Sequence, residues 1–443
     1  MNRVPVRLAL PLALSLLLIA CNKKSDSPAP TATDKAGETA APAARPVSIL
    51  ASWGGGEQEA FQKVLDGFTA KTGIRVQYEQ ARDAQLLATL RTRVASKNPP
   101  SIAILPRPGF MVDLAREGAL KPLTELGLSQ EELDRGYSQA WQELGTVDGK
   151  LYGLVVKANS KSTIWYKPAS FKALGLSVPG TWAELLAVSD KYVAAGKKPW
   201  AVGGGDGWTL TDWFENIYVR QAGPEKYTQL FGGKLPFTDP SVAAALKTMS
   251  GIVSNEKYVA GGRQGVLGTR FVDGIGRVFG KSPSAELYFE GGFVGPIALK
   301  SVNPELKPGE DIAFFPFPVI DAQFGSPLIG GGDVLAALVD SPEVRKLVQY
   351  VATKEAAELW AKTGAIVSPS KLVDRTVYPT ELARAEADQV AGAAVFRFDG
   401  SDLLPGALGE AWGTALQEVV EKPEDIERIL KEFEAKAAPE LKR

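Results

Sequence analysis

Aromatic and acidic side chains recur beside the glycine-rich segments of this chain. Three glycines at positions 203–205 are followed by Asp206 and, after one more glycine, by Trp208. The segment lacks the lysine and the spacing of a phosphate-binding loop. Glycine lets the backbone approach a ligand closely, a carboxylate accepts hydroxyl protons, and an indole ring offers a flat apolar face. Sugars carry hydroxyls at their edges and C–H groups on their faces, so we expect Asp206 and Trp208 to contact a sugar-like molecule.

Other aromatic residues also occur beside glycine-rich segments, where a ring can stack on a ligand. The candidates are Trp53, Trp208, Trp213, Phe293 and Trp412. Simple packing is the alternative for each of them, since tryptophan is often buried for its apolar area alone. Trp141, Trp182 and Trp360 lie within helical patterns, and we expect them in the core.

The 443 residues include no histidine and a single cysteine. Without histidine, the Ser-His-Asp, Cys-His and His-zinc forms of catalysis are excluded. Pairs of carboxylates remain available for glycoside hydrolysis, and all-oxygen sites remain available for calcium. We expect neither a metal nor a cofactor.

The cysteine, Cys21, directly follows an apolar stretch at residues 8–19, and two arginines precede that stretch. Twelve residues are too few to span a bilayer as a helix but suit a signal sequence. The spacing resembles a bacterial lipobox, in which the chain is cut before the cysteine and the thiol is acylated. The alternative, an ordinary secretory signal, would normally end in an A-x-A pattern. We therefore predict a signal peptide at 1–20, lipid on Cys21, and a periplasmic or cell-surface protein held to the membrane by that lipid.

The composition fits a large extracytoplasmic protein. Lysine and arginine number 50 against 51 acidic residues, so no basic surface for a nucleic-acid partner is expected. The length exceeds the usual single-domain limit of about 250–300 residues and predicts two domains. Residues 21–46 are rich in Ala, Pro, Thr and Ser and lack aromatic residues, so they are expected to form a disordered tether.

The folded part begins with alternating strand and helix patterns, which predict a parallel α/β domain. Expected strands are 47–53, 74–78 and 101–105, with helices at 57–68 and 86–94 between them. Loops that follow the carboxyl ends of such strands usually carry function. In this chain those loops contain Glu57, Arg82 and Arg107. Each of these charges is otherwise a solvated loop residue, or, for Glu57, favours the positive end of a helix.

The remaining chain shows further strand and helix patterns and no internal repeat. Strands are expected at 152–157, 200–202, 284–289 and 311–318. Helices are expected at 182–195, 212–221 and 242–253, as a pair within 341–361, and over most of 377–443.

Five segments together resemble a known family in their order and spacing. They read F-x6-F-x-A-x-T-G-I-x-V at 61–76, Y-G-L-V-V-K-A-N-x-K-S-x-I-W-Y-K-P at 152–168, F-x2-L-G-L-x-V-P-x-T-W-x-E-L at 171–185, W-x-L-T-D-W at 208–213 and F-D-G-S-D-L-L-P at 398–405. They resemble the extracellular family 1 solute-binding proteins of sugar ABC importers, which are related to maltose-binding protein, and within that family the alpha-glucoside-binding branch. The resemblance spans about residues 47–420.

This resemblance implies a two-lobed α/β periplasmic-binding-protein fold of type II-like form, with crossover hinge strands and a ligand cleft between the lobes. Lobe 1 would comprise 47–155 plus 319–366, and lobe 2 would comprise 156–318 plus 367–443. Such a protein is not an enzyme. It would be a monomer that captures a sugar, an alpha-glucoside or glucosyl osmolyte, by hinge closure, and it would deliver the sugar to the transmembrane subunits of an ABC permease.

The resemblance also assigns cleft residues. It places Glu57 in a ligand-binding loop, Lys157 at a crossover, Phe293 as an aromatic plate beside Glu290, Asp333 after the return crossover, and Asp402 with Trp412 in the wall of lobe 2. The complete set of expected sugar-binding residues is Trp53, Glu57, Arg82, Arg107, Lys157, Asp206, Trp208, Trp213, Glu290, Phe293, Asp333, Asp402 and Trp412.

Two alternatives remain open at this point. One is a secreted glycoside-processing enzyme that uses an Asp/Glu pair. The other keeps the fold but binds a polyamine between aromatic rings and the carboxylates of Glu57, Asp206, Glu290 and Asp333. The basic residues Arg82, Arg107 and Lys157 also leave an anionic sugar open as the ligand.

Overall fold

A computed structural model describes residues 46–441 of the chain. The predicted signal peptide, the lipid site at Cys21 and all but the last residue of the predicted tether lie outside this range. Within the described range, no helix is long and apolar enough to cross a membrane.

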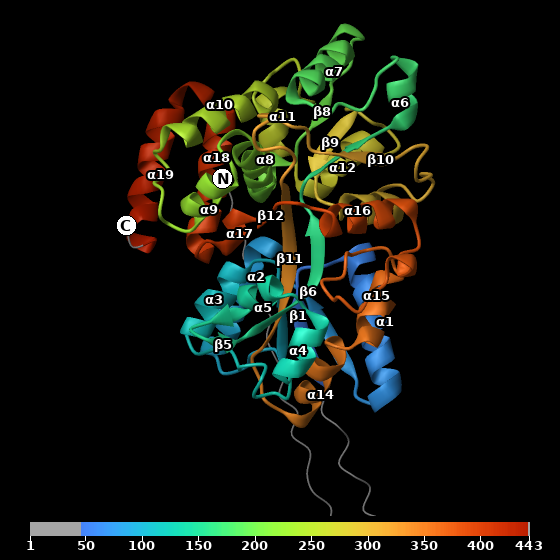
Figure 1. The fold of residues 1–443 in the computed structure, drawn as a ribbon, viewed down its shortest axis with the longest axis vertical. Helices are drawn as coiled ribbons and strands as arrows, with labels where there is room; N and C mark the ends of the chain where they lie inside the picture. The colour runs from blue at the N-terminus through green and yellow to red at the C-terminus, as the bar shows by residue number, and fades with distance from the viewer. Residues whose placement is uncertain (1–45, 442–443) are drawn as a thin grey trace, which may run out of the picture. The chain divides into compact units, whose positions relative to one another are not determined.

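The first of two principal sheets has six strands, and its strand order differs from the order along the chain (Figure 1). Its members are β1 (Val47–Ala51), β2 (Val76–Gln80), β3 (Ile102–Leu105), β6 (Gly153–Ser160), β11 (Leu328–Ala337) and β12 (Phe396–Phe398). β1 pairs in parallel with both β2 and β3. β11 is antiparallel to β3 and β6 and parallel to β12. Strand β11 therefore joins segments that are far apart in the sequence.

Helices cover both faces of this sheet. They are α1 (Gly55–Thr72), α2 (Asp83–Ala95), α3 (Pro108–Arg116), α4 (Gln130–Gly136), α5 (Gln139–Leu144), α14 (Pro342–Val351) and α15 (Lys354–Ala361). Successive strand residues point to opposite faces, so Ile49 joins the core beneath α1 and α15, and Leu50 joins the core beneath α2 and α3. Figure 1 shows these helix groups on the two sides of the sheet. We call this sheet with its helices lobe 1.

Helix α1 shows how the sequence fixes an element. Phe61, Val64, Leu65 and Phe68 are buried and recur at the spacing of one helix face. Gly73 then ends the helix in the left-handed conformation with φ 72°, which glycine adopts without steric cost. The helix thus buries its apolar face on the sheet and leads directly into β2.

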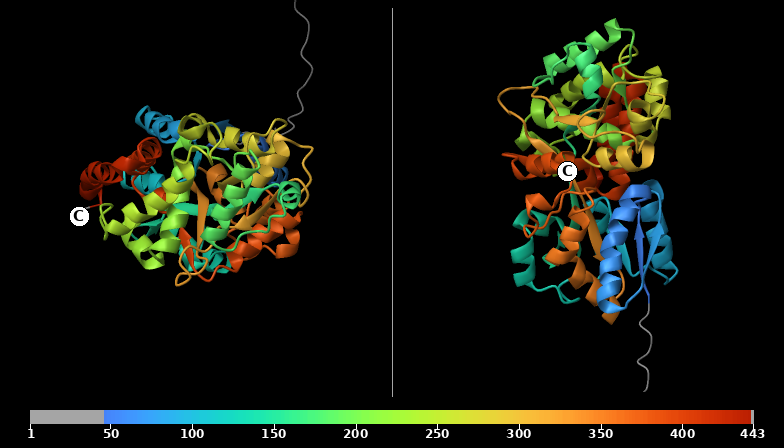
Figure 2. Two further views of the ribbon diagram at one scale, coloured as in Figure 1. Left: turned by 90° about the horizontal axis from the view of Figure 1, so that it is seen from above. Right: turned by 90° about the vertical axis from the view of Figure 1, so that its right-hand side faces the viewer.

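The second principal sheet has four strands in the order β10-β7-β9-β8. Its strands are β7 (Thr163–Tyr166), β8 (Trp200–Ala201), β9 (Leu287–Glu290) and β10 (Ala313–Pro316). The helices around it are α6 (Pro168–Ala173), α7 (Trp182–Ala194), α8 (Trp208–Gln221), α9 (Pro224–Phe231), α10 (Pro240–Val253), α11 (Gly262–Gly268), α12 (Phe271–Phe279), α13 (Val294–Ile297), α17 (Gly400–Leu403), α18 (Gly406–Glu421) and α19 (Ile426–Glu440). We call this group lobe 2. Figure 2 shows the two lobes from two further sides.

A few shorter elements complete the described chain. They are the hairpin of β4 (Thr146–Val147) and β5 (Lys150–Leu151), the 3-10 turns η1 (Gly204–Asp206), η3 (Arg375–Val377) and η4 (Pro423–Asp425), and the π-helix η2 (Ala298–Val302). Helix α16 (Glu381–Ala391) lies at the junction of the lobes. Its residues Ala383 and Ala387 pack with Ala158 of β6 in lobe 1. Its residue Glu386 lies so close to Gly292 of lobe 2 that a β-carbon added at Gly292 would overlap the carboxyl group.

The chain crosses between the lobes three times. Only Lys161 and Ser162 separate β6 of lobe 1 from β7 of lobe 2. The chain returns from β10 through residues 317–327 to β11. After α15 it runs through residues 362–380 and α16 to β12, the last strand of the first sheet, and then enters α17 of lobe 2. Residues at these crossings therefore lie at the boundary of the two sheets.

The expected α/β fold and most of its elements are confirmed. The five elements predicted between residues 47 and 105 correspond to β1, α1, β2, α2 and β3, and the helical pair within 341–361 corresponds to α14 and α15. Strands β4, β5, β7, β11 and β12 were not predicted. β11 contains the glycines 330–332, which are unfavourable in strands, and the three-residue β12 lies within a segment expected to be helical.

Candidate functional site

A cavity of about 860 Å³ lies between the lobes and is lined by residues of both. Lobe 1 contributes the loops that follow β1, β2 and β3, which carry Trp53 with Glu57, Arg82 and Arg107 respectively. These are the carboxyl ends of the parallel strands, where ligands bind in α/β folds. The volume is within the range of sites for small molecules.

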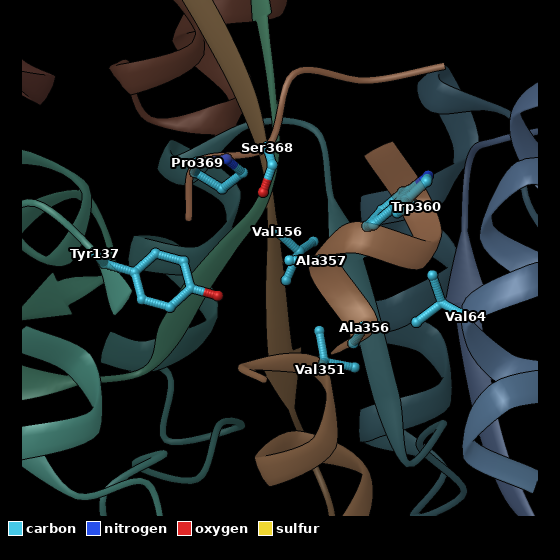
Figure 3. A pocket seen from close by; sticks show the side chains of 9 residues that line it. All are labelled: Val64, Tyr137, Val156, Val351, Ala356, Ala357, Trp360, Ser368 and Pro369. Atoms are coloured by element: carbon cyan, nitrogen blue, oxygen red, sulfur yellow. The ribbon is translucent and has the colours of Figure 1, made fainter. Parts of the chain in front are cut away.

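A second, much smaller gap of about 10 Å³ lies inside lobe 1 and is shown in Figure 3. Its walls are mostly apolar side chains of the core, and it has room for roughly one water molecule. Its lining residues are Val64, Tyr137, Val156, Val351, Ala356, Ala357, Trp360, Ser368 and Pro369. This gap is a packing defect of the core rather than a ligand site.

Lys157 organises the polar wall of lobe 1 in the large cavity. Its side chain is buried, and its Nζ lies 2.5 Å from an oxygen of Glu57 and 3.4 Å from an oxygen of Asp333. Burial alone would lower the pKa of Lys157, but the two carboxylates outweigh burial and raise it. Lys157 therefore remains charged, and it holds two acceptor groups at the cavity surface.

Lys161 forms a second charged group at the first crossover. Its Nζ bonds the carboxylate of Asp399 and lies 3.3 Å from Asp212 and 3.2 Å from Asp402. Asp402 also lies 3.4 Å from Arg107 of lobe 1. Burial would raise the pKa of Asp399, but Lys161 and the surrounding hydrogen-bond donors lower it below its usual range.

Asp402 differs from Asp399 because burial and then the charge of Asp399 raise its pKa to about 7. Farther from the cavity, burial raises the pKa of Asp212, Glu215 and Glu290 well above the usual range. Several carboxyls around one ammonium group cannot all be ionised at low cost. Burial and repulsion between like charges therefore disfavour ionisation of the whole cluster, in which Glu215 of α8 accepts hydrogen bonds from Gly400 and Ser401 of α17.

An aromatic cluster forms the facing wall in lobe 2. The ring centroids of Trp208 and Phe271 are 4.9 Å apart, and those of Phe271 and Phe293 are 5.4 Å apart. The Nζ of Lys161 lies 5.6 Å from the Trp208 ring, and the Nζ of Lys157 lies 5.3 Å from the ring of Trp53. Both distances permit cation–π attraction. The cavity is thus lined by aromatic rings and by hydrogen-bonding groups, and each lobe contributes both kinds.

Asp206 is held by groups of lobe 2. One of its oxygens accepts a hydrogen bond of 3.0 Å from Arg270, and the other accepts one of 2.8 Å from the backbone N–H of Phe271. The carboxylate therefore fixes the start of α12, which carries Phe271 into the cavity wall. Remaining lone pairs of Asp206 face the cavity, since the residue lines it.

Ten of the thirteen residues expected to bind sugar line the cavity. They are Trp53, Glu57, Arg82, Arg107, Lys157, Asp206, Trp208, Phe293, Asp333 and Asp402. Because these residues converge on one cavity from both lobes, each of them can reach a ligand bound there. Their roles in binding stay a prediction.

The other three, Trp213, Glu290 and Trp412, do not line the cavity, and their expected cleft position is corrected here. Trp213 is buried against Trp200 and Phe289. Trp412 packs between aromatic rings of the lobe 2 core, and Glu290 is buried at the end of β9. All three lie near glycine-rich segments in the sequence, but they sit on buried element faces, so proximity to glycine was a misleading signal.

Sequence reasoning missed several cavity residues, including Asn159, Lys161, Arg270 and Phe271. A signal for two of them was present. Lys157 and Asn159 are two apart in a strand that is otherwise largely apolar and so share a face, and Lys161 continues the alternation just after the strand ends. For Arg270 and Phe271 no comparable pattern exists, because they are brought to the cavity by the fold of lobe 2.

Within residues 46–441, no group of three or more acidic, cysteine or histidine side chains is arranged to hold a metal ion.

Comparison with known proteins gives a family match over residues 54–358, to the model described as bacterial extracellular solute-binding protein. The osmoprotective compounds-binding protein GgtB of Synechocystis is 40% identical over 367 residues, which cover 82% of this chain and 85% of the relative. The alpha-glucosides-binding periplasmic protein AglE of Rhizobium meliloti is 33% identical over 376 residues, which cover 82% and 80%.

Solved structures show the same fold at lower sequence identity. A chitin oligosaccharide binding protein superposes with a TM-score of 0.77 at 20% identity, over 90% of this chain and 100% of the other. The solute receptor AcbH, whose structure is described with a preference for galactopyranose, gives a TM-score of 0.77 at 20% identity, over 89% and 98%. These likenesses establish the two-lobed architecture.

Proposed function

The chain belongs to the bacterial extracellular solute-binding protein family, and from that premise we propose that it is the sugar-binding component of an ABC importer. The proposed cargo is an alpha-glucoside or a glucosyl osmolyte. The observation that carries this proposal is the cavity between the lobes, which is lined by aromatic rings together with paired charges. The names of GgtB and AglE, which refer to osmoprotective compounds and alpha-glucosides, support the choice of cargo.

The two walls fit the two kinds of surface on a pyranose. The rings of Trp208, Phe271 and Phe293 would cover its C–H face. Glu57, Lys157 and Asp333 would exchange hydrogen bonds with hydroxyls at its edge, since carboxylate oxygens accept hydrogen bonds and an ammonium group has three donors. Because the walls belong to different lobes, a bound sugar would favour the closed arrangement.

The charges of the cavity do not favour a polyamine. Three of the carboxylates that would bind its ammonium groups already have cationic partners: Glu57 and Asp333 pair with Lys157, and Asp206 pairs with Arg270. A polyamine would have to displace these partners. A neutral, hydroxyl-bearing ligand leaves all of the pairs in place.

We further propose that the protein is a non-catalytic lipoprotein. The signal peptide would be 1–20, the lipid would be carried by Cys21, and 21–46 would be the tether. Lobe 1 would comprise 47–155 plus 319–366 and lobe 2 would comprise 156–318 plus 367–443, and the loaded monomer would dock on the permease. Labelling with a radioactive fatty acid, which Cys21→Ser should abolish, tests the anchor. The absence of turnover on nitrophenyl glycosides is the expected result for a non-enzyme.

A thermal-shift panel tests the cargo. The compounds are maltose, trehalose, sucrose, glucosylglycerol, glucosylglycerate, spermidine and calcium. A ligand at a hundred times its dissociation constant stabilises the native state by about 2.7 kcal/mol, which is readily measured. A shift with one group of neutral glucosides is expected. A shift with spermidine or calcium alone would contradict the sugar proposal.

Trp208→Ala should remove most of the shift, because it deletes the largest ring of the aromatic wall. Trp182→Ala is the matched control, since Trp182 packs against Phe317 and does not line the cavity. An equal loss of the shift in both variants would mean that general destabilisation, rather than a lost ligand contact, is responsible.

A further inference from the structure

Both crossovers that flank the cavity are fixed to lobe 2 by side chains of α8. The Nδ2 of Asn216 donates to the carbonyl of Lys161 (2.8 Å), and its Oδ1 accepts from the hydroxyl of Ser162 (2.7 Å). The Ser162 hydroxyl in turn accepts from the backbone N–H of Ile329 (2.9 Å), at the start of β11. Arg220 donates to the carbonyl of Pro327 (2.6 Å). Residues 161–162 and 327–329 must therefore move with lobe 2.

Ser160 is also fixed to lobe 2. Its carbonyl accepts from the N–H of Gly292 (2.8 Å), which follows β9. Its own N–H donates to the carboxyl of Glu386 on α16 (3.0 Å). The lobe 2 attachment of the first crossover therefore begins at Ser160.

The residue two positions earlier is fixed to the other side. Ala158 packs with Ala361 of α15 in lobe 1, and it exchanges two backbone hydrogen bonds, of 2.9 Å and 3.1 Å, with Val367 in the segment that follows α15. On the return crossover, Val334 pairs with Leu105 of β3 in lobe 1. These contacts leave Asn159 in β6 and residues 330–333 in β11 between the parts of the two strands that each lobe holds.

Both crossover strands are irregular near this interval. Residues 330–332 of β11 are glycines. Asp333 pairs with Lys157 and Val334 pairs with Val155, so Val156 is an extra residue in β6. Such a bulge bends the strand that carries the extra residue and loosens its ladder. The glycines also admit close neighbours, because a β-carbon at Gly331 would lie 3.1 Å from the Asn159 side-chain oxygen.

Asn159 is unusual among the residues of this interval. It lines the cavity, its exposed fraction is only 6%, and within the described part of the chain its Oδ1 has no hydrogen-bond partner. An unpaired buried amide oxygen is costly, and such groups in native proteins usually have a partner. An amide can both donate to and accept from a hydroxyl, and a half-turn about its last side-chain bond exchanges the two groups.

We infer that Asn159 binds a hydroxyl of the ligand and, because it lies at the bending point of β6, makes the arrangement of the lobes depend on occupancy of the cavity. The inference rests on the proposed function for the identity of the ligand. The location of the bending point rests on the protein alone, so the two parts have separate tests.

Amide hydrogen exchange of the full-length protein without ligand tests the bending point. The amides of Asn159 and of 331–333 should exchange at least tenfold faster than those of Ser162 and Ile329, which the α8 contacts hold. Faster exchange at Ser162 and Ile329 would overturn the assignment. This result does not depend on whether any sugar binds, so it separates a failed hinge assignment from a failed proposed function.

Titration calorimetry with trehalose, sucrose and glucosylglycerol tests the ligand contact. Asn159→Ala should weaken the binding of whichever of them binds the wild type by at least tenfold. Asn255→Ala is the control. Asn255 lies at the end of α10 and does not line the cavity, so this variant should bind the sugar with the same affinity as the wild type. Unchanged affinity in Asn159→Ala would overturn the inference, whereas the absence of any binding by the wild type would count against the proposed function instead.

A readout beyond affinity separates a coupling role from a structural one. In the wild type, saturating sugar should slow exchange at 331–333. In Asn159→Ala, the slowing should be largely lost even when the cavity is saturated. Asn159→Ser retains a donor and an acceptor in a smaller side chain, so it should recover part of the slowing of exchange. It also serves as the second variant if Asn159→Ala folds poorly. Full slowing of exchange at 331–333 in sugar-saturated Asn159→Ala would show that Asn159 does not couple occupancy of the cavity to the bending region.

Discussion

At the scale of single residues, Lys157 balances two carboxylates in the cavity wall, and its removal should be costly. Lys157→Met leaves Glu57 and Asp333 close together without their cation. Removing one partner of a buried ion pair typically costs about 3–5 kcal/mol. We expect a loss of that order in the free energy of unfolding, measured by urea denaturation. Lys157→Met combined with Asp333→Asn should recover part of it, and failure to do so would mean that packing of the lysine stem dominates.

Glu386 should make stability depend on pH in a predictable direction. Burial raises its pKa to about 7, although the hydrogen bond from Ser160 and the charge of Lys157 oppose this. Because the folded-state pKa is above the unfolded value of about 4.3, the stabilising contribution is complete below pH 4 and is lost as the pH rises through 7.

Glu386→Gln removes this ionisation and keeps the acceptor for Ser160. The variant should therefore have a higher melting temperature than the wild type at pH 8, with a gain in the free energy of unfolding of up to about 3 kcal/mol, and should approach the wild type at pH 4. Thermal unfolding at both pH values checks this. A variant that is less stable at pH 8 would show that the ionised carboxylate is favourable in the native state.

The residues that sequence reasoning placed correctly share a physical feature. Glu57, Arg82 and Arg107 each follow a strand whose apolar pattern is clear, so the strand ends could be located from the sequence. The positions predicted for Trp213 and Trp412 differ from the structure because both lie on helices. A helix presents different residues to a core and to a cavity, and tertiary packing decides which face points where. Asn159 carries no local signal except its alternation with two lysines.

At the scale of elements, the N-terminus of α3 meets the chain between α17 and α18 without room for a side chain. A β-carbon at Gly109 would lie 2.1 Å from the carbonyl oxygen of Leu404 and 3.1 Å from that of Asp402. Nearby, the N–H of Gly406 donates to Asp113 of α3 (3.1 Å). Gly109 therefore permits this contact between the lobes.

Gly109→Ala should lower the free energy of unfolding by about 1–3 kcal/mol, the usual cost of overpacking, as measured by urea denaturation. Helix propensity alone predicts the opposite sign, because alanine is favoured over glycine in helices. Gly136→Ala is the control, since nothing lies within 4 Å of its β-carbon position and its φ is not positive. A stabilised Gly109→Ala protein would show that the contact is not retained in solution.

Elements were predictable where their pattern is periodic and long. The α1 and α14–α15 helices repeat apolar residues at helical spacing, and the strands β1 and β3 are short apolar runs bounded by turns. β11 was missed because its pairing partners, not its own residues, make it a strand. Strands β3 and β6 both pair with β11, and the hydrogen bonds of these two ladders stabilise a strand that the glycines of β11 alone would not favour.

At the scale of the whole molecule, each lobe is assembled from distant parts of the chain. The strands β1 to β6 of lobe 1 come from the first part of the chain, whereas its strand β11 follows the lobe 2 strands β7 to β10 in the sequence. A protein truncated after residue 327 should therefore lack its lobe 1 fold, because β3 and β6 lose their shared partner. Near-UV circular dichroism and dye binding to exposed apolar surface check this. A truncated protein with native-like near-UV signals would contradict it.

The late position of β11 also sets the order of events as the protein is made. Residues 47–160 emerge first but wait for more than 160 further residues before the strand that joins β3 to β6 is available. Pairings across such separations form slowly, since loop closure must precede the contacts that reward it. The nascent chain therefore stays open for longer than its length alone would require. Slow closure of lobe 1 would also keep the chain unfolded for export, which the signal peptide proposed at 1–20 would require.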